Sequence, residues 1–439
     1  MLRAFEYRLY PDEDQKVLIH KHIGASRWIY NWGLGVKSNA WTTEQKQVSR
    51  FDLQEQLPAM RKPESETCWL KEVNSQSIQA TLIHLESAYT RFFKKTADFP
   101  VFKSKKDSKQ SFEIPQNLTV DFDHGRIEIP KFKTPIKARF HRHFRGTIKT
   151  CTIKRTPTGK YFVSILVEDG VAVLAKQEPV FKESVGIDVG IKSFAVTSEG
   201  EVFENPRHFV KSQEKLKRLQ QSFSRKLKIS KHVKGQPIGK NAMAVKQEIN
   251  LLHEYIANQR KDFLHKLSTR LIRENQSVCV EDLNVKGMMA NGKLAKHVQD
   301  LGLGMFYSFL GYKSDWAGKH VLECGRWDAS SKTCSKCGWY YKDLTLSERT
   351  WTCGNPACKA FHDRDVNAAL NIRSMAFLRY TRGIEEAKQQ SAGNSGSKSV
   401  KRKSKDELDG KKARIKGSGE VLPGQKGHAA KLSKKPRGL

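Results

Sequence analysis

The chain has 439 residues, more than one compact core usually supports, so we expect two or more domains. Its 79 Lys and Arg outnumber 46 Asp and Glu, which gives a formal net charge of +33, and this excess favours a nucleic acid as the partner. A hydrophobic fraction of 38% excludes a wholly disordered chain, and no apolar run reaches membrane-spanning length. The first residues also lack the short basic segment and the apolar segment that a signal peptide has.

The first hundred residues predict one strand and then helices. Residues 2–10 alternate in polarity like a strand. From Asp12 to about Leu57 the apolar residues recur at helical spacing. A second helical stretch covers residues 74–95 and begins at Asn74, a residue type that caps helix N-termini.

Beyond Pro100 the sequence changes to short alternating runs separated by turn residues. Two of these runs flank the turn TPTGK at residues 156–160, which predicts a β-hairpin. We therefore expect this basic part of the chain to form a small barrel or sheet.

A new pattern begins at Ser184. Three short strands with tight turns cover residues 184–208, two long helical stretches follow, and one more strand covers residues 276–283. This order predicts an α/β layout in which helices cover a mixed sheet. The last segment, residues 389–439, is rich in Lys, Gly and Ser, so it cannot offset its ordering entropy and is expected to be disordered.

Four of the eight cysteines cluster, and the other four are isolated. This usage suits a reducing compartment, and hence the cytoplasm, better than a disulfide framework. The four cysteines form two closely spaced pairs, here called knuckles, which are separated by an insert long enough for a β-hairpin. This spacing predicts a structural zinc ion with tetrahedral coordination. Four thiolates leave no open coordination position, so one Zn²⁺ would fold the module rather than catalyse. The candidate ligands are Cys334, Cys337, Cys353 and Cys358.

The insert between the knuckles contains several basic and aromatic residues. Together they suit stacking on a nucleic acid strand. For Trp351, a place in the core of the small module is an equally open alternative.

Two acids lie in apolar strands. Asp188 stands in VGIDVGIKS, and Glu281 ends SVCVE, where alternation places it with Cys279 on the face opposite Val278 and Val280. A charge in such a strand is costly to bury unless it is paired or bound to metal. Either acid alone is weak evidence for a site, and the two together on neighbouring strands are stronger.

The stretch CKAFHDRDVNAALNI offers a third acid, either Asp363 or Asp365. Helical residues advance about 100° each, so the two aspartates point to nearly opposite sides. Asp365 shares a face with Ala368, Ala369 and Ile372, and these small and apolar residues allow a close approach to a sheet. Asp363 is better placed as the N-cap of the helix.

Three carboxylates from separate elements are what a pair of divalent ions requires. Mg²⁺ prefers carboxylate oxygens, and two ions ~4 Å apart can activate a water and stabilise the leaving oxygen of a phosphodiester. We therefore expect Asp188, Glu281 and Asp365 to be both the catalytic residues and the ligands of two Mg²⁺.

In this combination the motifs closely resemble those of TnpB, a family of insertion-sequence-encoded RNA-guided nucleases related to type V CRISPR effectors. YRLYP and RWIYNWGL resemble the family's first strand and recognition helices, and FPVFKSKKDSKQSFEIP is similar to the segment that enters its β-barrel wedge domain. GIDVGIKSFAV, VEDLNVKGM and HDRDVNAALNI resemble its three RuvC motifs, with a zinc ribbon before the third. The resemblance covers nearly all of the chain before the tail.

This resemblance implies a multidomain α+β fold with a helical recognition lobe, a β-barrel wedge domain and an RNase H-like (RuvC) α/β nuclease domain carrying an inserted four-cysteine zinc ribbon. The expected divisions are 1–10 (first wedge strand), 11–100 (helical recognition), 101–180 (wedge), 181–331 (first two RuvC motifs), 332–360 (zinc ribbon), 361–388 (third RuvC motif) and 389–439 (basic tail).

The resemblance also implies an RNA-guided, Mg²⁺-dependent DNA endonuclease of an insertion sequence that cleaves target DNA beside a short adjacent motif. Its partners would be a guide RNA encoded at the transposon end and double-stranded target DNA, with one protein chain on the RNA and no membrane. It would work in a prokaryotic cytoplasm, at the nucleoid. Candidate nucleic-acid contacts are Arg27, Tyr30, Gln76, Gln79, Lys103 and Lys105.

Two alternative functions stay open, a DNA-strand transferase and an RNA-guided DNA-binding regulator that does not cleave. The order Asp, Glu, Asp disfavours the first, because DDE-type transferases generally place Glu last. The intact set of three acids disfavours the second.

Overall fold

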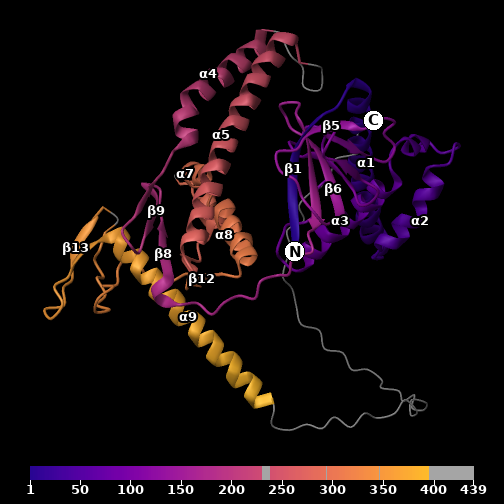
Figure 1. Cartoon of the computed structure of the whole chain (residues 1–439). Helices are drawn as coiled ribbons and strands as arrows, with labels where there is room; N and C mark the ends of the chain where they lie inside the picture. Colours follow the sequence, from indigo (N-terminus) through magenta and orange to yellow (C-terminus); the bar gives the residue numbers. More distant parts are fainter. Residues whose placement is uncertain (230–237, 293, 346, 395–439) are drawn as a thin grey trace, which may run out of the picture. The chain divides into compact units, whose positions relative to one another are not determined.

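The computed structural model describes residues 1–229, 238–292, 294–345 and 347–394 (Figure 1). The chain divides after Ile384 into two compact units, and the first holds every element below except the last turns of the final helix. Among the described helices, none is both long and apolar enough to cross a membrane.

Three α-helices follow the first strand: α1 (Glu13–Glu44), α2 (Arg50–Met60) and α3 (Ser75–Phe93), with the 3-10 helix η1 (Cys68–Glu72) before α3. The Asn74 side chain accepts a hydrogen bond from the backbone N–H of Gln76 at 2.8 Å, which confirms the predicted cap of α3. The helical stretch expected from Asp12 to Leu57 is two helices. Gln45 ends α1 in a left-handed conformation (φ 52°), and Ser49 caps α2.

A seven-stranded antiparallel sheet has the order β2-β6-β7-β1-β5-β4-β3. The predicted hairpin is β6–β7. Its turn is closed by a hydrogen bond from Thr156 N–H to the Lys160 carbonyl at 2.8 Å and holds Gly159 at φ 80°. No described pairing joins the edge strands β2 and β3, so closure into a barrel stays a prediction. The strands are β1 (Leu2–Tyr10), β2 (Gln110–Ile114), β3 (Thr119–Asp121), β4 (Arg126–Glu128), β5 (Ile136–Arg139), β6 (Thr147–Arg155) and β7 (Tyr161–Glu168).

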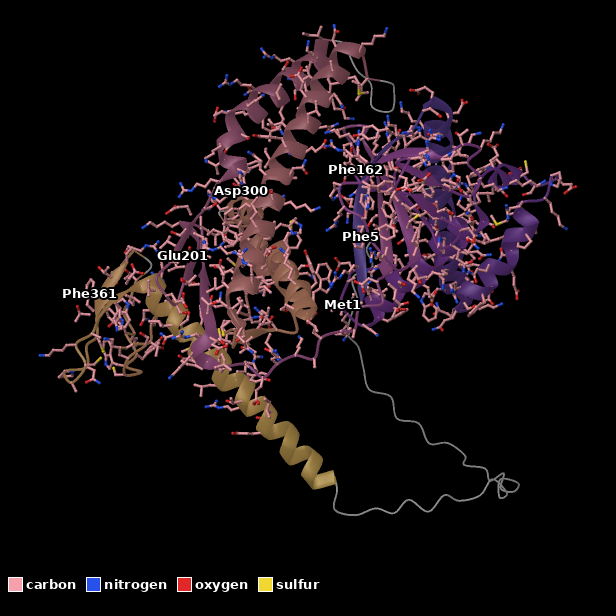
Figure 2. All side chains as sticks on the ribbon, in the orientation of Figure 1. Met1, Phe5, Phe162, Glu201, Asp300 and Phe361 are labelled. Carbon is pink, nitrogen blue, oxygen red and sulfur yellow. The ribbon has the colours of Figure 1, made fainter. Side chains whose placement is uncertain are left out.

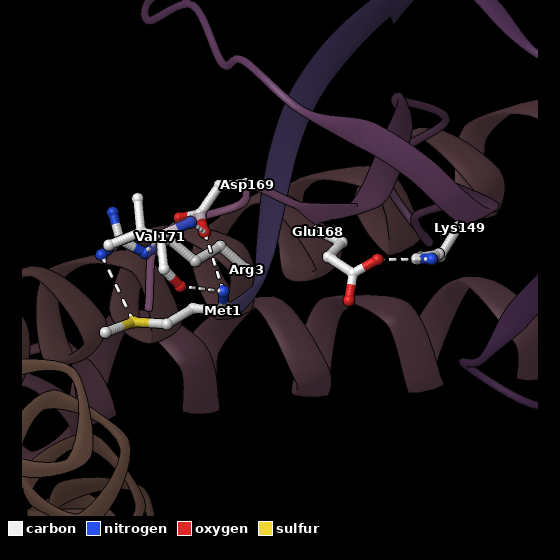
Figure 3. Close-up of polar contacts among 6 residues, drawn as sticks. All are labelled: Met1, Arg3, Lys149, Glu168, Asp169 and Val171. Carbon is white, nitrogen blue, oxygen red and sulfur yellow. Dashed lines mark hydrogen bonds and ion pairs between the residues drawn. The ribbon is translucent and has the colours of Figure 1, made fainter. Parts of the chain in front are cut away.

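The start of β1 is held beside the end of β7 (Figure 3). The amino group of Met1 contacts Asp169 Oδ1 at 2.9 Å and the carbonyl of Val171 at 2.6 Å. Nearby, Lys149 of β6 pairs with Glu168 of β7 at 2.5 Å. These polar contacts tie β1, β7 and β6 together at this end of the sheet.

A second, five-stranded sheet has the order β10-β9-β8-β11-β12. β11 is parallel to β8 and β12, and β9 is antiparallel to β8 and β10, so the predicted mixed sheet is confirmed. The sequence pattern missed β12, a short strand that follows a helix directly. The strands are β8 (Ser184–Val189), β9 (Ser193–Thr197), β10 (Val202–Glu204), β11 (Ser277–Glu281) and β12 (His320–Cys324).

Helices cover both faces of this sheet (Figure 1). Val278 and Val280 of β11 pack on α5 and α8 through residues such as Leu264 and Phe306. Cys279, which points the opposite way, packs on Ile372 of α9. The helices are α4 (His208–Ile229), α5 (Lys240–Glu274), α6 (Val285–Ala290), α7 (Ala295–Leu301), α8 (Leu303–Ala317) and α9 (Arg364–Asn394), with the 3-10 helix η2 (Phe181–Glu183) before β8.

α9 is longer than the sequence led us to expect. It includes residues 389–394, for which the composition predicts disorder; the rest of the predicted tail lies outside the described residues. Strong helix formers such as Glu385 and Glu386 carry the helix past the apolar part of its sequence.

Buried polar contacts fix the helices around the sheet. Asp300 of α7, labelled in Figure 2, accepts a hydrogen bond from Phe209 N–H at the start of α4 at 3.0 Å and one from Arg260 of α5 at 3.2 Å. Lys319, just before β12, donates to the carbonyls of Ile272 and Asn275 at 2.6 and 2.8 Å. It thereby satisfies carbonyls that the end of α5 leaves unpaired.

The ribbon between β12 and α9 contains the antiparallel pair β13 (Thr350–Thr352) and β14 (Phe361–Asp363). Trp351 is only 4% exposed and packs with Leu344 and two of the clustered cysteines. Trp351 is therefore a core residue of the ribbon, and its role is packing rather than stacking on a nucleic acid strand.

Candidate active site and metal centre

The three predicted acids come from elements that meet at one end of the five-stranded sheet. Asp188 lies near the end of β8, Glu281 ends β11, and Asp365 lies in the first turn of α9. β8 and β11 run parallel with Gly186 beside Cys279, so the two strand acids, each two residues further on, share the face of Cys279. That face is the one α9 covers.

The carboxyl of Asp188 has an unusual electrostatic environment. Burial, and then the nearby carboxylates of Glu281 and Asp365, raise its pKa to about 8, while Arg364 and Arg349 act in the opposite direction. The charges of Glu281 and Asp365 therefore both act on the carboxyl of Asp188. A divalent cation would relieve that repulsion and favour the ionised form of Asp188.

Glu281 is oriented by a residue that α9 itself holds in place. Ser330 Oγ donates a hydrogen bond to Glu281 Oε1 at 2.6 Å. Asn371 of α9 in turn donates through Nδ2 to the carbonyls of Ser330 and Thr333 at 2.7 and 2.6 Å. The helix that carries Asp365 thus also sets the position of Glu281.

The two aspartates at the start of α9 have different contacts. Asp363 Oδ1 accepts hydrogen bonds from the backbone N–H groups of Asp365 and Val366, both at 3.0 Å, which confirms the predicted cap. Asp365 Oδ1 instead lies 3.4 Å from Nη1 of Arg349, an arginine of the ribbon. Its role as a metal ligand stays a prediction.

Tyr307 of α8 has a buried hydroxyl within electrostatic range of two of the acids. Burial, and then the charges of Glu281 and Asp188, raise its pKa. Within the described part of the chain the hydroxyl has no hydrogen-bond partner and no exposure to solvent. A buried hydroxyl without a partner lowers the stability of the folded protein by about 1–3 kcal/mol. A hydrated divalent ion would supply the missing partner. Carboxylate oxygens beside a polar hydroxyl form a donor set that fits Mg²⁺.

The four clustered cysteines converge as the sequence predicted. Their Sγ atoms all lie within 4.8 Å of one another, so the four thiols could hold a metal ion. The pKa of Cys337 is lowered to about 7, chiefly by a hydrogen bond from the backbone N–H of Trp339. This shift favours the thiolate form, which is the form that binds a metal. His362 Nε2 lies 3.1 Å from Cys334 Sγ, the position of a donor to a bound thiolate. The donor set fits tetrahedral zinc.

Three of the candidate nucleic-acid contacts gather where α1 meets the segment before β2. Arg27 and Lys103 line a groove of about 510 Å³. Asn31 ties this segment to α1 through hydrogen bonds with the backbone carbonyl and N–H of Lys103 at 2.8 and 2.7 Å. Tyr30 is only 6% exposed, with the Lys103 ammonium 3.9 Å from its ring centroid, so packing explains it better than base stacking.

The other three candidates lie on α3 and in the segment before β2. Gln76 donates to Gln116 at 3.2 Å, whereas Gln79 and Lys105 are exposed. The structure leaves Gln79 and Lys105 accessible, pairs Gln76 within the protein, and does not bring the three into one site.

Ser330, Tyr307 and the pairing of Arg349 with Asp365 were not anticipated from the sequence. One signal was present, because Asn367 and Asn371 stand one turn apart among buried apolar residues, and buried amides need partners. Nothing near Tyr307 in the sequence marks its hydroxyl as part of a site.

Parts of the chain match three described families. Residues 163–292 match a family described as "probable transposase" (OrfB_IS605), and residues 304–372 match the Cas12f1-like TNB domain. Residues 1–46 match a helix-turn-helix domain (HTH_OrfB_IS605), although here they form β1 and the single helix α1. A putative RNA-guided DNA endonuclease of Streptomyces pristinaespiralis is 36% identical to this chain, over 91% of the chain and 95% of the relative. The chain belongs to the TnpB family.

A second relative agrees with this membership in the TnpB family. InsQ, a putative RNA-guided DNA endonuclease of Escherichia coli K12, is 32% identical over 84% of this chain and 91% of its own length. The solved structure of CasPhi-2 (Cas12j) bound to crRNA and phosphorothioate-DNA covers 86% of this chain and 91% of its own at 10% identity, with a TM-score of 0.39 that is too low to support an argument. The TNB match contains all four clustered cysteines and Asp365.

Proposed function

We propose that this TnpB-family chain is an RNA-guided, Mg²⁺-dependent DNA endonuclease with a RuvC-type active site. The observation that carries the proposal is the convergence of Asp188 with Glu281 and Asp365, whose charges add to the effect of burial in raising the pKa of Asp188 to about 8. Three mutually repelling carboxylates have a physical reason to persist when cations neutralise them. The relatives from Streptomyces pristinaespiralis and Escherichia coli, both named as putative RNA-guided DNA endonucleases, support the reaction class and the use of a guide.

In this proposal the three acids hold two Mg²⁺, which when bound supply an activated water and stabilise the leaving oxygen of the phosphodiester. Ser330 keeps Glu281 in one orientation through its 2.6 Å hydrogen bond. Arg349 neutralises Asp365 in the metal-free protein, and its guanidinium is suited to a DNA phosphate once metal replaces it there. The hydroxyl of Tyr307, which has no partner among the described residues, would be free to donate to a water of a bound ion.

Zn²⁺ bound by the four clustered cysteines has a structural role in this proposal. The ribbon supplies Arg349, and the segment that leads into it supplies Ser330, so its fold sets the positions of two side chains at the acids.

The proposed partners are a guide RNA encoded at the transposon end and double-stranded DNA that carries a short motif beside the target. One chain would act on each RNA in the cytoplasm. The groove lined by Arg27 and Lys103 is the best-formed candidate contact for nucleic acid. Its cationic side chains suit phosphate, and the net charge of +33 suits two nucleic-acid partners.

The test uses the full chain, co-expressed with its transposon end and purified with the RNA it retains. A plasmid library places a sequence that matches the guide end of this RNA beside randomised bases. We expect Mg²⁺-dependent linearisation of one subset of plasmids. Asp188→Ala should retain RNA and DNA binding without cleavage, while Asp262→Ala, which removes an exposed α5 acid, should cleave like the wild type. Binding without cleavage by the wild type would overturn the proposal in favour of a regulator.

A DNA-strand transferase is the second candidate, because the description of the matched family is "probable transposase". The same reaction separates the two functions. A transferase would join a labelled transposon end to the target DNA, whereas an endonuclease releases broken ends without joining them.

A further inference from the structure

The turn after β12, residues 325–329, crosses the end of the catalytic sheet beside Glu281. Cys324, the last residue of β12, is the register partner of Glu281 in β11. Ser330, the first residue after the turn, donates its hydroxyl to the Glu281 carboxylate. Both ends of the turn are therefore tied to the same acid.

This turn is held in one conformation by its own hydrogen bonds. Gly325 N–H donates to the Asp328 carboxylate at 2.6 Å, and Asp328 N–H donates to the Gly325 carbonyl at 3.1 Å. Arg326 reaches across to β11 and pairs with Asp282, the residue after Glu281, at 2.7 Å. A side chain at the tip is therefore presented in a fixed direction.

The residue at that tip is Trp327, which is 92% exposed. No aromatic or cationic side chain stacks on its indole within the described part of the chain. By contrast, Trp351 of the neighbouring ribbon is only 4% exposed, so the fold near this site is able to bury a tryptophan side chain. An exposed indole on a pinned turn gains nothing from folding, because burial is what makes an apolar side chain stabilising.

We propose that Trp327 is a stacking platform for an unpaired base of the DNA strand that is cleaved at the acids. This inference rests on the proposed nuclease function and adds a substrate contact to it. Base–aromatic stacking is tolerant of sequence, since every base offers a π-face, and that tolerance suits an enzyme whose target is chosen by its guide. The occupant is single-stranded, because a base inside a duplex has both faces covered.

The position of Trp327 explains what stacking would achieve. A single strand is flexible, and productive cleavage requires its phosphodiester to stay beside Asp188, Glu281 and Asp365. A base stacked three residues along the chain from Ser330 would hold the strand next to Glu281. Trp327 is a positioning residue in this scheme and takes no part in the chemical step.

The binding experiment uses the guide-loaded full chain with Asp188→Ala, which prevents cutting. Target DNA carries 2-aminopurine at successive positions of either strand, and stacking quenches its fluorescence. We expect quenching at one or two positions of one DNA strand. Trp327→Ala should abolish it and Trp327→Phe should restore most of it. Trp41→Ala, which removes a half-exposed tryptophan of α1, should leave it unchanged.

The cleavage experiment uses the same Trp327 variants with Asp188 intact and a target that is already unpaired at the cut site. Trp327→Ala should reduce cleavage at limiting DNA on the order of ten-fold, with melting temperature, zinc content and bound RNA unchanged. Normal quenching and normal cleavage by Trp327→Ala would overturn the platform, as would the absence of any Trp327-dependent quenching at every labelled position of both DNA strands. A wild type that quenches but never cuts would overturn the nuclease function and still support the platform.

Discussion

Gly186 of β8 lies directly against the backbone carbonyl of Ala369 in α9. A methyl group on residue 186 would stand 2.0 Å from that oxygen and 2.9 Å from Cβ of Arg373. The absent side chain therefore lets α9 approach the sheet closely. Asp188 follows two residues later on the same strand, and Asp365 lies one turn earlier on the same helix, so this contact brings two of the acids together.

Gly186→Ala should destabilise the nuclease fold by about 1–3 kcal/mol, because the clash is with backbone that cannot rotate away. Cleavage should fall further than stability, since Asp365 would move with α9. Gly304→Ala on α8 is the matched control, because nothing lies within 4 Å of its added methyl group. The control should be neutral or slightly stabilising in thermal melts. Equal stability of the two variants would show that α9 is not in close contact at Gly186.

Asp365→Ala and Asp363→Ala should separate chemistry from capping. Asp365→Ala should abolish detectable cleavage with little change in melting temperature. Asp363→Ala removes the acceptor of two backbone N–H groups and should cost about 0.5–2 kcal/mol while much of the cleavage survives. Circular-dichroism melts and plasmid cleavage measure the two effects. The assignment of the acids is wrong if only the Asp363 variant fails to cut.

The metal-free protein should lose stability as pH rises. The folded-state pKa of Asp188, about 8, is above its ordinary value of 3.8, so between these values the folded state holds a proton that the unfolded state has released. Stability should therefore fall across this window, by at most about 1.4 kcal/mol per pH unit, and level off above pH 8. Asp188→Asn should remove this component in melts from pH 5 to 9 without added Mg²⁺.

Binding of Mg²⁺ should reverse that dependence. The ion requires an ionised Asp188, so binding at neutral pH should release about one proton. Calorimetry in buffers of different ionisation enthalpy would count it. Proton release that is unchanged in Asp188→Asn would assign the raised pKa to the wrong residue.

Tyr307→Phe should raise the stability of the metal-free protein and lower its affinity for Mg²⁺. Loss of a buried hydroxyl without a partner should stabilise the metal-free protein by up to about 1 kcal/mol. Mg²⁺ affinity should fall, since the hydroxyl would no longer donate to the ion's water shell. Tyr340→Phe on the exposed part of the ribbon is the control and should change neither. A less stable Tyr307→Phe protein would mean that the hydroxyl already has a partner.

Loss of zinc should uncouple cleavage from RNA binding. Cys353→Ser should lower the bound zinc and unfold the ribbon, which displaces Arg349 from Asp365. We expect cleavage to be lost while the guide RNA still copurifies. Cys68→Ser, which changes a cysteine outside the cluster, should retain zinc and activity. Zinc analysis and cleavage assays give both readouts.

The sequence by itself determined the local patterns that lead to the site. Alternation along β11 placed Glu281 on the face of Cys279, and helix geometry separated the capping Asp363 from Asp365. The spacing of four cysteines determined their convergence, because each knuckle is a local turn. These features depend on residues that are near one another in the chain, and strand and helix periods fix such relations.

Only the tertiary structure decided which distant groups surround the acids. Ser330 is 49 residues from Glu281, and Arg349 belongs to a ribbon whose orientation no periodicity encodes. β12 was missed because five residues after a helix carry too little pattern to reveal a strand, yet its pairing places the turn of Trp327 beside Glu281. Contacts between elements arise from packing, and packing depends on the shapes of both partners rather than on either segment alone.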